Sequence, residues 1–167
     1  MKAGVIYSSL TGNTKKIAEA IYEEIKIEKD IFKSNEEFNI EDYDILIIGY
    51  WVNKGICDDK IKEILEKANN KKIVLFGTLG ARENGPYYES IKKRIDELVP
   101  ESNEILGHFL CQGKINEKLT ERYKEMLKTN KWDEHVKEQL ENHKQASTHP
   151  DEKDIYNAKT FINNILN

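Results

Sequence analysis

Residues 5–14, V-I-Y-S-S-L-T-G-N-T, pass directly from an apolar run into hydroxyl-bearing side chains around one glycine. The apolar run is typical of a buried strand. Ser8, Ser9, Thr11 and Thr14 offer hydroxyl donors directly after it. The free N–H groups at the start of a helix attract an anion, and a helix is expected to begin here. The stretch therefore predicts a strand that ends in an anion-binding turn.

The backbone N–H groups from Leu10 to Thr14, including that of Asn13, are expected to point outward, and Gly12 permits close backbone approach. The loop has no Lys or Arg before Lys15. We therefore expect uncharged donors alone to hold a terminal monophosphate. Neither the G-x-x-x-x-G-K-[ST] loop for nucleoside triphosphates nor the G-x-G-x-x-G fingerprint for dinucleotides is present, so ATP and NAD are disfavoured. The alternative interpretation is an ordinary Ser/Thr helix cap.

Five apolar segments are expected to be strands: residues 2–7, a weaker one around 31–32, 44–50, 72–77 and 104–111. Continuous apolar runs of this kind are typical of strands buried on both faces, as in a parallel sheet. The carboxyl ends of such strands share one edge, where ligand crevices form. The polar turn after residue 7 is therefore expected at that edge.

The strand segments alternate with sequences in which apolar residues recur every three or four positions, the period of a helix. These sets are Ile17, Ala18, Ile21 and Ile25; Ile61, Ile64, Leu65 and Ala68; and Ile91, Ile95 and Leu98. The alternation predicts an α/β protein with a doubly wound, five-stranded parallel sheet and helices on both faces.

Residues 114–149 depart from this alternation. An apolar stripe crosses Lys- and Glu-rich sequence in 114–145 and predicts one bent helix or two consecutive helices. A last helix is expected to carry Pro150 in its first turn, with Thr148 or His149 before it as the cap.

Composition limits the classes of function. The 167 residues, 38% hydrophobic and 34% charged, suit one domain, and a net charge of −4 without a basic stripe disfavours nucleic acid. No apolar run approaches the roughly 20 residues that cross a membrane. Two distant cysteines, Cys57 and Cys111, fit a reducing cytoplasm. His108, His135 and His143 lack metal-ligand spacing, and no metal is expected.

The pattern S-S-L-T-G-N-T-x-x-x-A at residues 8–18 resembles the phosphate-binding loop of flavodoxins, [ST]-x-T-G-x-T. The resemblance covers residues 2–112 and the final helix, whereas 114–149 is longer than in the shortest flavodoxins. It implies a flavodoxin-like sheet with strand order 2-1-3-4-5, and FMN bound where the strand order reverses.

In flavodoxins the loops after the third and fourth strands hold the flavin ring. The resemblance implies that Trp51, or Tyr50 as the weaker candidate, stacks on the ring, the alternative being ordinary aromatic packing. The rest of this loop is Val52, Asn53, Lys54 and Gly55. The resemblance also implies a peptide that flips on reduction, either Asn53–Lys54 or Lys54–Gly55, and a plain turn glycine is the alternative for Gly55.

In the loop after the fourth strand, Thr78, Leu79 and Gly80 are expected to present backbone groups to the pyrimidine edge of the ring. Tyr87 or Tyr88 is expected to cover its second face, with Leu79 or no side chain as the alternative wall. For Tyr88 we favour first-turn packing, because Pro86 is expected to start a helix there.

Two further segments are weaker candidates. The sequence C-Q-G at 111–113 ends the fifth strand at the same edge and is a candidate border of the ring, although packing is favoured for Cys111. A histidine at position 149 is a candidate proton gate or substrate contact, and a structural cap is the favoured alternative.

The resemblance implies a one-electron carrier for which no catalytic acid or base is required. The acidic surface of the protein includes Asp58, Asp59 and Glu83. It predicts a low reduction potential for the flavin and redox partner proteins with basic docking faces. One alternative is an FMN-dependent reductase, or a flavodoxin-like reductase subunit, that acts on a small organic acceptor. The acceptor would enter a crevice beside Trp51, Tyr87 and His149, with 114–145 as its wall or lid. Another is a non-redox scaffold that has lost FMN.

Overall fold

The computed structural model describes all residues from 1 to 167. Its strands are β1 (Lys2–Tyr7), β2 (Glu28–Lys33), β3 (Ile45–Asn53), β4 (Ile56–Cys57), β5 (Lys72–Leu79) and β6 (Glu104–Gln112). Its α-helices are α1 (Asn13–Glu24), α2 (Asp59–Lys67), α3 (Gly85–Asp96), α4 (Glu117–Thr129), α5 (Glu134–Ala146) and α6 (Glu152–Leu166). A short 3₁₀ helix, η1, covers Ile40–Asp42.

The main sheet is parallel and follows the order β2-β1-β3-β5-β6. The two-residue strand β4 pairs antiparallel with the end of β3 and lies off this path. Counted without β4, the order is 2-1-3-4-5, so the predicted topology is confirmed. The order reverses at β1 and β3, whose carboxyl ends therefore flank the switch point.

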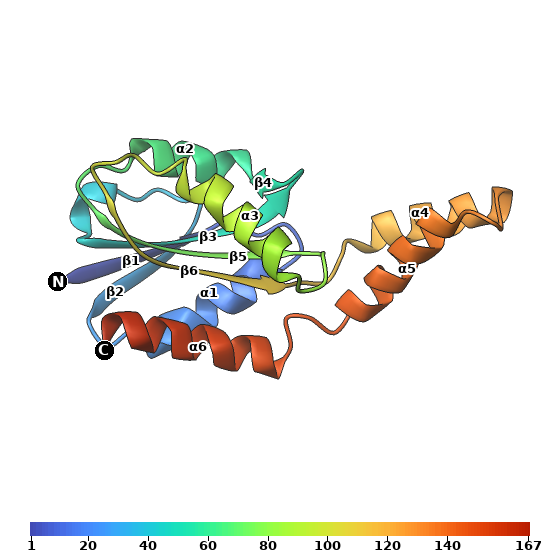
Figure 1. The fold of residues 1–167 in the computed structure, drawn as a ribbon. Coiled ribbons are helices and arrows are strands. Elements are labelled where there is room, and N and C mark those ends of the chain that lie inside the picture. Colours follow the sequence, from blue (N-terminus) through green and yellow to red (C-terminus); the bar gives the residue numbers. More distant parts are fainter.

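Helices cover both faces of the sheet, with α2 and α3 on one side and α1 and α6 on the other (Figure 1). Each face has its own apolar cluster. One contains Ile61 and Ile91, and the other contains Ile17 and Ile162. Fully burying one such side chain contributes roughly 1.5–3 kcal/mol. Burial on both faces explains why the central strands read as unbroken apolar runs.

Two predicted boundaries are wrong. The third strand does not end at residue 50 but continues to Asn53, because β4 folds back and pairs with Val52 and Asn53. Pro150 does not lie in the first turn of the last helix. The helix begins at Glu152, and its cap is Asp151, which forms a reciprocal capping box with Asp154.

The segment 114–145 forms two helices rather than one bent helix. α4 and α5 run out and back as a hairpin that projects from the body, beyond the end of the sheet at which β5 and β6 finish (Figure 1). α4 has no buried residue, whereas α5 buries Val136, His143 and Ala146. None of the helices is both long enough and apolar enough to span a bilayer.

A chain of hydrogen bonds runs through the core beside β3. The Tyr50 side chain is fully buried, and its hydroxyl oxygen lies 2.6 Å from His108 Nε2. His108 Nδ1 lies 2.7 Å from Asp96 Oδ1. Because the Asp96 carboxylate accepts from Nδ1–H, Nε2 accepts from the tyrosine hydroxyl. A Cβ at Gly77 would lie 2.3 Å from the Tyr50 ring, so only glycine leaves room for it.

Tyr50→Phe removes the donor to His108 and leaves the buried Nε2 without a partner. We expect the free energy of unfolding to fall by about 1–3 kcal/mol. Tyr156→Phe is the matched control, because Tyr156 is 68% exposed and its loss should change stability by less than about 0.5 kcal/mol. Urea unfolding of the two variants measures both values. Equal effects would show that the Tyr50 hydroxyl is not engaged as described.

The hydrogen bonds between Tyr50, His108 and Asp96 also predict that the free energy of unfolding depends on pH. Burial lowers the pKa of His108 below its ordinary value of 6.5, despite the opposing effect of Asp96. As the pH falls through 6.5, the unfolded chain takes up the proton first, so the free energy of unfolding declines until the pH is below the folded pKa. Urea unfolding at about pH 7.5 and about pH 5.5 should show this loss, and His108→Gln should reduce it. Burial also lowers the pKa of His143, so part of the dependence should remain.

Candidate functional site

The turn after β1 lies at the carboxyl edge of the sheet. Ser8 N–H donates to the Gly49 carbonyl at 3.0 Å, which continues the pairing of β1 with β3 before the chain turns away. Gly12 then precedes α1 with φ +93°, in the left-handed region that favours glycine. The turn therefore delivers the start of α1 to the point where the strand order reverses.

This turn is only partly satisfied by its own side chains. Ser9 Oγ accepts from the Gly12 N–H at 3.1 Å and from the Lys15 N–H at 3.2 Å. The N–H groups of Leu10, Thr11, Asn13 and Thr14 have no hydrogen-bond partner in the protein. Four free donors therefore lie beside the positive end of α1, an arrangement that can bind an anion, and the anion site stays a prediction.

Thr14 has a different role from the one expected for its hydroxyl. The side chain is buried, and Oγ1 lies 3.2 Å from the Tyr50 carbonyl and 2.8 Å from Thr78 Oγ1. The hydroxyl therefore joins α1 to β3 and β5 and does not face the outside of the turn. Only the Thr14 N–H is available to a ligand.

Asn13 connects the turn to the chain after β6. Its Nδ2 donates to Thr11 Oγ1 at 3.0 Å and to the Lys114 carbonyl at 2.8 Å. A Cβ at Gly113 would lie 2.5 Å from that amide nitrogen, so the two segments are in close contact. The Asn13 side chain thus links the predicted anion turn to the base of the α4–α5 hairpin.

That uncharged donors alone hold the phosphate stays a prediction, although lysines lie near one side of the turn. A polar hollow of about 390 Å³ lies there and is lined in part by Ser8, Ser9 and Gly12. Lys15 and Lys33 also line it. The sequence did not indicate that Lys33 lies beside this turn, because β2, which carries Lys33, pairs with β1 across 26 residues.

On the other side of the turn lies a crevice of about 380 Å³, within the range of about 300–1,000 Å³ for small-molecule sites. Eight of the predicted residues line it: Leu10, Thr11, Asn13, Trp51, Val52, Thr78, Leu79 and Gly80. Nine do not: Ser8, Ser9, Gly12, Thr14, Tyr50, Asn53, Lys54, Gly55 and Tyr87. We call this hollow the crevice.

The two aromatic candidates after β3 are distinguished by burial. Trp51 is half-buried and lines the crevice, whereas Tyr50 is fully enclosed in the core, so Tyr50 as a stacking residue is wrong. Trp51 belongs to β3 itself and pairs with Thr78 of β5. The crevice therefore has one aromatic wall, carried on a strand.

The remaining residues of the predicted loop form a tight β-turn between β3 and β4. Lys54 and Gly55 occupy its centre with φ +52° and +82°. Two residues with positive φ are the type I′ arrangement of two-residue hairpins. The Gly55 carbonyl accepts from Arg94 Nη1 at 3.1 Å. This turn lies outside the crevice lining, and its glycine is required by the turn.

The carbonyl groups after β5 are used within the protein. The Leu79 carbonyl accepts from the Gly113 N–H at 2.8 Å. The Gly80 carbonyl accepts from Gln112 Nε2 at 3.0 Å and from Asn142 Nδ2 at 3.1 Å. Only the N–H groups of Gly80 and Ala81 have no protein partner. This stretch can therefore donate hydrogen bonds to a ligand but not accept them.

The tyrosines of α3 provide no second aromatic wall. Tyr88 packs in the first turn as favoured, and its hydroxyl donates to the Ala81 carbonyl at 2.7 Å. Tyr87 is 40% exposed and does not line the crevice. The alternative with Leu79 as an apolar wall agrees with its place in the lining.

Asp58 is not a surface charge. Its side chain is buried, caps α2 by accepting from the Ile61 N–H at 3.4 Å, and leaves Oδ1 without a hydrogen-bond partner. Burial raises the pKa of this carboxyl, and the neighbouring Ser8 hydroxyl opposes the rise. Asp59 and Glu83 are exposed as expected.

The weaker candidates pack rather than face the crevice. Cys111 is buried, and burial raises the pKa of its thiol, as burial raises the pKa of the Cys57 thiol to about 12. His149 Nδ1 lies 2.7 Å from Asp154 Oδ2. His149, Asp151 and Asp154 bring donor atoms of the kind that bind metals within 4.8 Å of one another, but the carboxylates form the α6 capping box.

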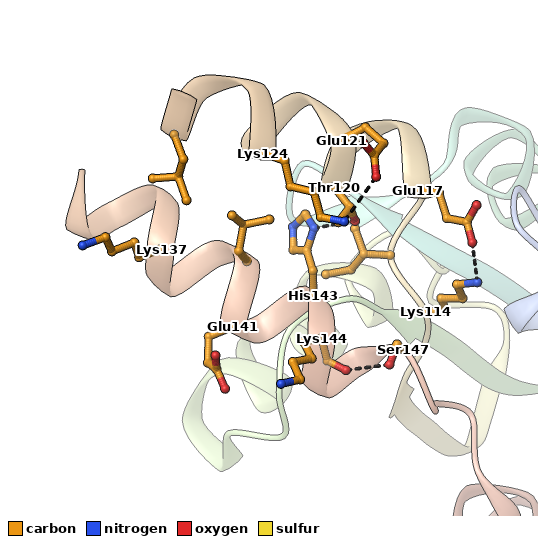
Figure 2. Close-up of a pocket in the computed structure, with 13 residues that line it drawn as sticks. Lys114, Glu117, Thr120, Glu121, Lys124, Lys137, Glu141, His143, Lys144 and Ser147 are labelled. Carbon is orange, nitrogen blue, oxygen red and sulfur yellow. Dashed lines mark hydrogen bonds and ion pairs between the residues drawn. The ribbon is translucent and has the colours of Figure 1, made fainter. Parts of the chain in front are cut away.

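A third hollow, the groove between α4 and α5, has a volume of about 840 Å³ (Figure 2). Ion pairs such as Lys124–Glu121 at 3.3 Å and Lys114–Glu117 at 2.9 Å line its rim. His143 lies inside it, with Nδ1 2.8 Å from Thr120 Oγ1. Lys114, Ile115 and His143 line both this groove and the crevice, so the two hollows adjoin.

Sequence reasoning missed most of the crevice wall that the hairpin supplies. These residues are Lys114, Ile115, Asn116, Leu119, Gln139, Asn142 and His143. The sequence indicated this wall in one way only: for a reductase, residues 114–145 were expected to form a wall or lid of the crevice. A sharper signal is the pair Gln139 and Asn142, uncharged and three residues apart in a segment otherwise rich in Lys and Glu.

A family model and a similar protein sequence both relate this chain to flavodoxins. The profile of a family described as the flavodoxin domain matches residues 4–163. The chain is 55% identical to the flavodoxin-like domain-containing protein BilS of Clostridioides difficile, over 99% of this chain and 97% of that protein. Both proteins therefore share the segment that forms the hairpin.

Solved structures have the same fold. A flavodoxin from Streptococcus pneumoniae TIGR4 aligns with a TM-score of 0.59 at 16% identity, covering 99% of this chain and 97% of that one. A flavoprotein in complex with FMN from Lactobacillus acidophilus aligns with a TM-score of 0.52 at 22% identity, covering 65% of this chain and 92% of that one.

Thr14→Val tests the inward role of the Thr14 hydroxyl. The change keeps the shape of the side chain but leaves the Tyr50 carbonyl and the Thr78 hydroxyl with fewer partners. We expect the free energy of unfolding to fall by about 1–3 kcal/mol. Thr11→Val, at an exposed position of the same turn, should cost less than about 0.5 kcal/mol. If the two losses measured by urea unfolding were equal, Thr14 would not be the residue that joins α1 to the sheet.

Proposed function

Because the chain belongs to the flavodoxin family, we propose that it binds FMN in the crevice and acts as a one-electron carrier. The observation that carries the proposal is the set of four free N–H groups at the start of α1, beside a crevice with Trp51 on its wall. A phosphate group matches the free donors, and an aromatic ring matches Trp51.

Different residues of the site match the phosphate and the ring of FMN. The N–H groups of Leu10, Thr11, Asn13 and Thr14 are offered to the phosphate, without a side chain of the protein in their place. Trp51 and Leu79 are offered to the faces of the ring, and the Gly80 N–H to its polar edge. Bound FMN exchanges electrons one or two at a time.

The chain's own residues would orient the ring and limit its contact with water. Trp51 is fixed by the pairing of β3 with β5, and the hairpin residues Leu119 and Asn142 also line the crevice. Asp59 and Glu83 are exposed and follow β4 and β5 in the chain, and negative charge on this part of the surface opposes reduction of the ring. Asp58 adds less to this effect than the sequence suggests, because burial favours its protonated form.

Partner proteins with basic docking faces remain our proposal for the electron donor and acceptor. The net charge of −4 favours their approach. No group in the crevice is required as a catalytic acid or base for this role.

A second candidate function is an FMN-dependent reductase, or a reductase subunit, with a small organic acceptor. The groove between α4 and α5 favours it, because the groove adjoins the crevice and Leu127 and Leu140 are among its lining residues. Tyr87 and His149, which the sequence suggested for this crevice, do not line it. A scaffold without FMN is disfavoured by the free donors of the turn.

Gly12→Ala tests the binding site. No atom lies within 4 Å of the added Cβ, so the effect is backbone strain at φ +93°, roughly 1–2 kcal/mol. The empty turn of the variant can relax from this conformation, and binding must then restore it. We therefore expect FMN to bind the purified apoprotein with one equivalent per chain and the variant to bind about 5- to 30-fold more weakly. Gly85→Ala is the matched control, because Gly85 also has open space around it but no positive φ.

The titration is followed by flavin absorbance and fluorescence, and stepwise chemical reduction then separates the two candidate functions. A carrier should accumulate long-wavelength absorbance at the one-electron stage, whereas a two-electron reductase should pass directly to the fully reduced form. Failure of the wild-type protein to bind FMN at micromolar concentration would refute both functions.

A further inference from the structure

Asp58 carries a buried carboxyl group that is only partly satisfied. The residue precedes α2 and is 5% exposed. Oδ2 accepts from the Ile61 N–H at 3.4 Å, whereas Oδ1 is enclosed without a hydrogen-bond partner. No basic side chain pairs with the carboxyl. Such an oxygen requires an explanation, because burying a carboxylate without partners costs free energy.

The Asp58 carboxyl is a neighbour of both the turn after β1 and Trp51. The Ser8 hydroxyl, from that turn, and the Trp51 N–H, from β3, face the carboxyl, and neither completes a hydrogen bond to Oδ1. Ser8 also lines the hollow beside the turn, together with Ser9 and Gly12. One residue, Ser8, therefore joins the buried carboxyl to the turn that offers free N–H groups to an anion.

An anion at this turn and an ionised Asp58 disfavour each other. Burial raises the pKa of Asp58 above its ordinary value of 3.8, with the Ser8 hydroxyl opposing the rise, and no charged group of another element contributes. The titratable residues next to it, Cys57, Asp59 and Lys62, belong to its own segment, and the Cys57 thiol is uncharged because its pKa is about 12. A nearby negative charge raises the pKa of a carboxyl further. By reciprocity, a proton on the carboxyl strengthens the binding of an anion.

We propose that Asp58 is a positioning residue for phosphate, and that a phosphate group binds the turn after β1 together with a proton from solvent on the Asp58 carboxyl. The neutral carboxyl donates to the Ser8 oxygen, which leaves the Ser8 hydroxyl free to donate to the anion. The ionised carboxyl accepts from Ser8 instead and adds a negative charge beside the site. The affinity for phosphate therefore falls as Asp58 ionises. This inference rests on the proposed function, because FMN supplies the phosphate.

The proton linkage is tested by titrating the apoprotein with FMN at pH values from about 5 to about 8. Asp58→Asn keeps the shape of the side chain and a good helix cap but cannot ionise. The two proteins should bind FMN equally at the lowest pH, and the variant should bind about tenfold more tightly at the highest. The phosphate of FMN also titrates, near about pH 6, but it does so for both proteins. The ratio of the two affinities therefore isolates Asp58.

Asp59→Asn is the matched control, because it removes one negative charge from the next residue, which is exposed. Its FMN affinity relative to wild type should not change with pH. Riboflavin lacks the phosphate, so its affinities for wild type and Asp58→Asn should keep a constant ratio. A constant ratio for FMN with Asp58→Asn would overturn the proposal. Equal changes with Asp59→Asn, or with riboflavin, would overturn it as well.

Urea unfolding of the apoproteins separates this inference from the proposed function. Because the pKa of Asp58 is raised in the folded state, wild type should lose stability relative to Asp58→Asn as the pH rises from the unfolded value of about 3.9 through the folded pKa. A difference that does not change with pH would show that Asp58 is not a buried ionising group. Asp58→Ser, which also caps a helix, is a second neutral variant should Asp58→Asn fail to fold.

The two failures are distinguishable. If the wild-type protein bound no FMN at micromolar concentration, the proposed function and the link to phosphate would fail together, and the unfolding data would still show whether Asp58 ionises in the interior. If FMN bound and the affinity ratio were the same at every pH, the role of Asp58 would fail and the binding of FMN would stand.

Discussion

The buried hydroxyl of Thr14 is the contact on which the geometry of the site depends. It lies between the Tyr50 carbonyl and the Thr78 hydroxyl and thereby joins the first turn of α1 to the two strands beside it. The helix start is consequently held at the carboxyl edge of the sheet, and the free N–H groups of the preceding turn are presented there. Together with the packing of Ile17 in the core, this tether fixes the place of the turn relative to Trp51.

The fold was predictable because each of its main elements has a local signature. The strands β1, β3 and β5 are continuous apolar runs, and the helices between them have an apolar period of three or four residues. The turn after β1 could be located for the same reason. Its side-chain roles could not, because the inward rotation of Thr14 and the approach of Lys33 depend on strands that are distant in the sequence.

The missed features share one physical cause. The extension of β3 to Asn53 is decided by its pairing with β4, and the enclosure of Tyr50 is decided by the space at Gly77 and the hydrogen bond to His108. The hairpin's contribution to the crevice depends on Asn142 and Gln112, which meet at the Gly80 carbonyl. All of these are long-range contacts, and apolar periodicity reports only which residues share a face.

The position of Trp51 on a strand has a consequence for any ring that rests on it. A side chain at the tip of a loop must be ordered when its ligand arrives, and that ordering reduces the affinity. The backbone of Trp51 is already fixed by its neighbours in β5, so the platform exists before it is occupied. A rigid platform also moves little when the charge above it changes. In the carrier role that we propose, this would keep small the structural rearrangement that accompanies each electron's arrival or departure.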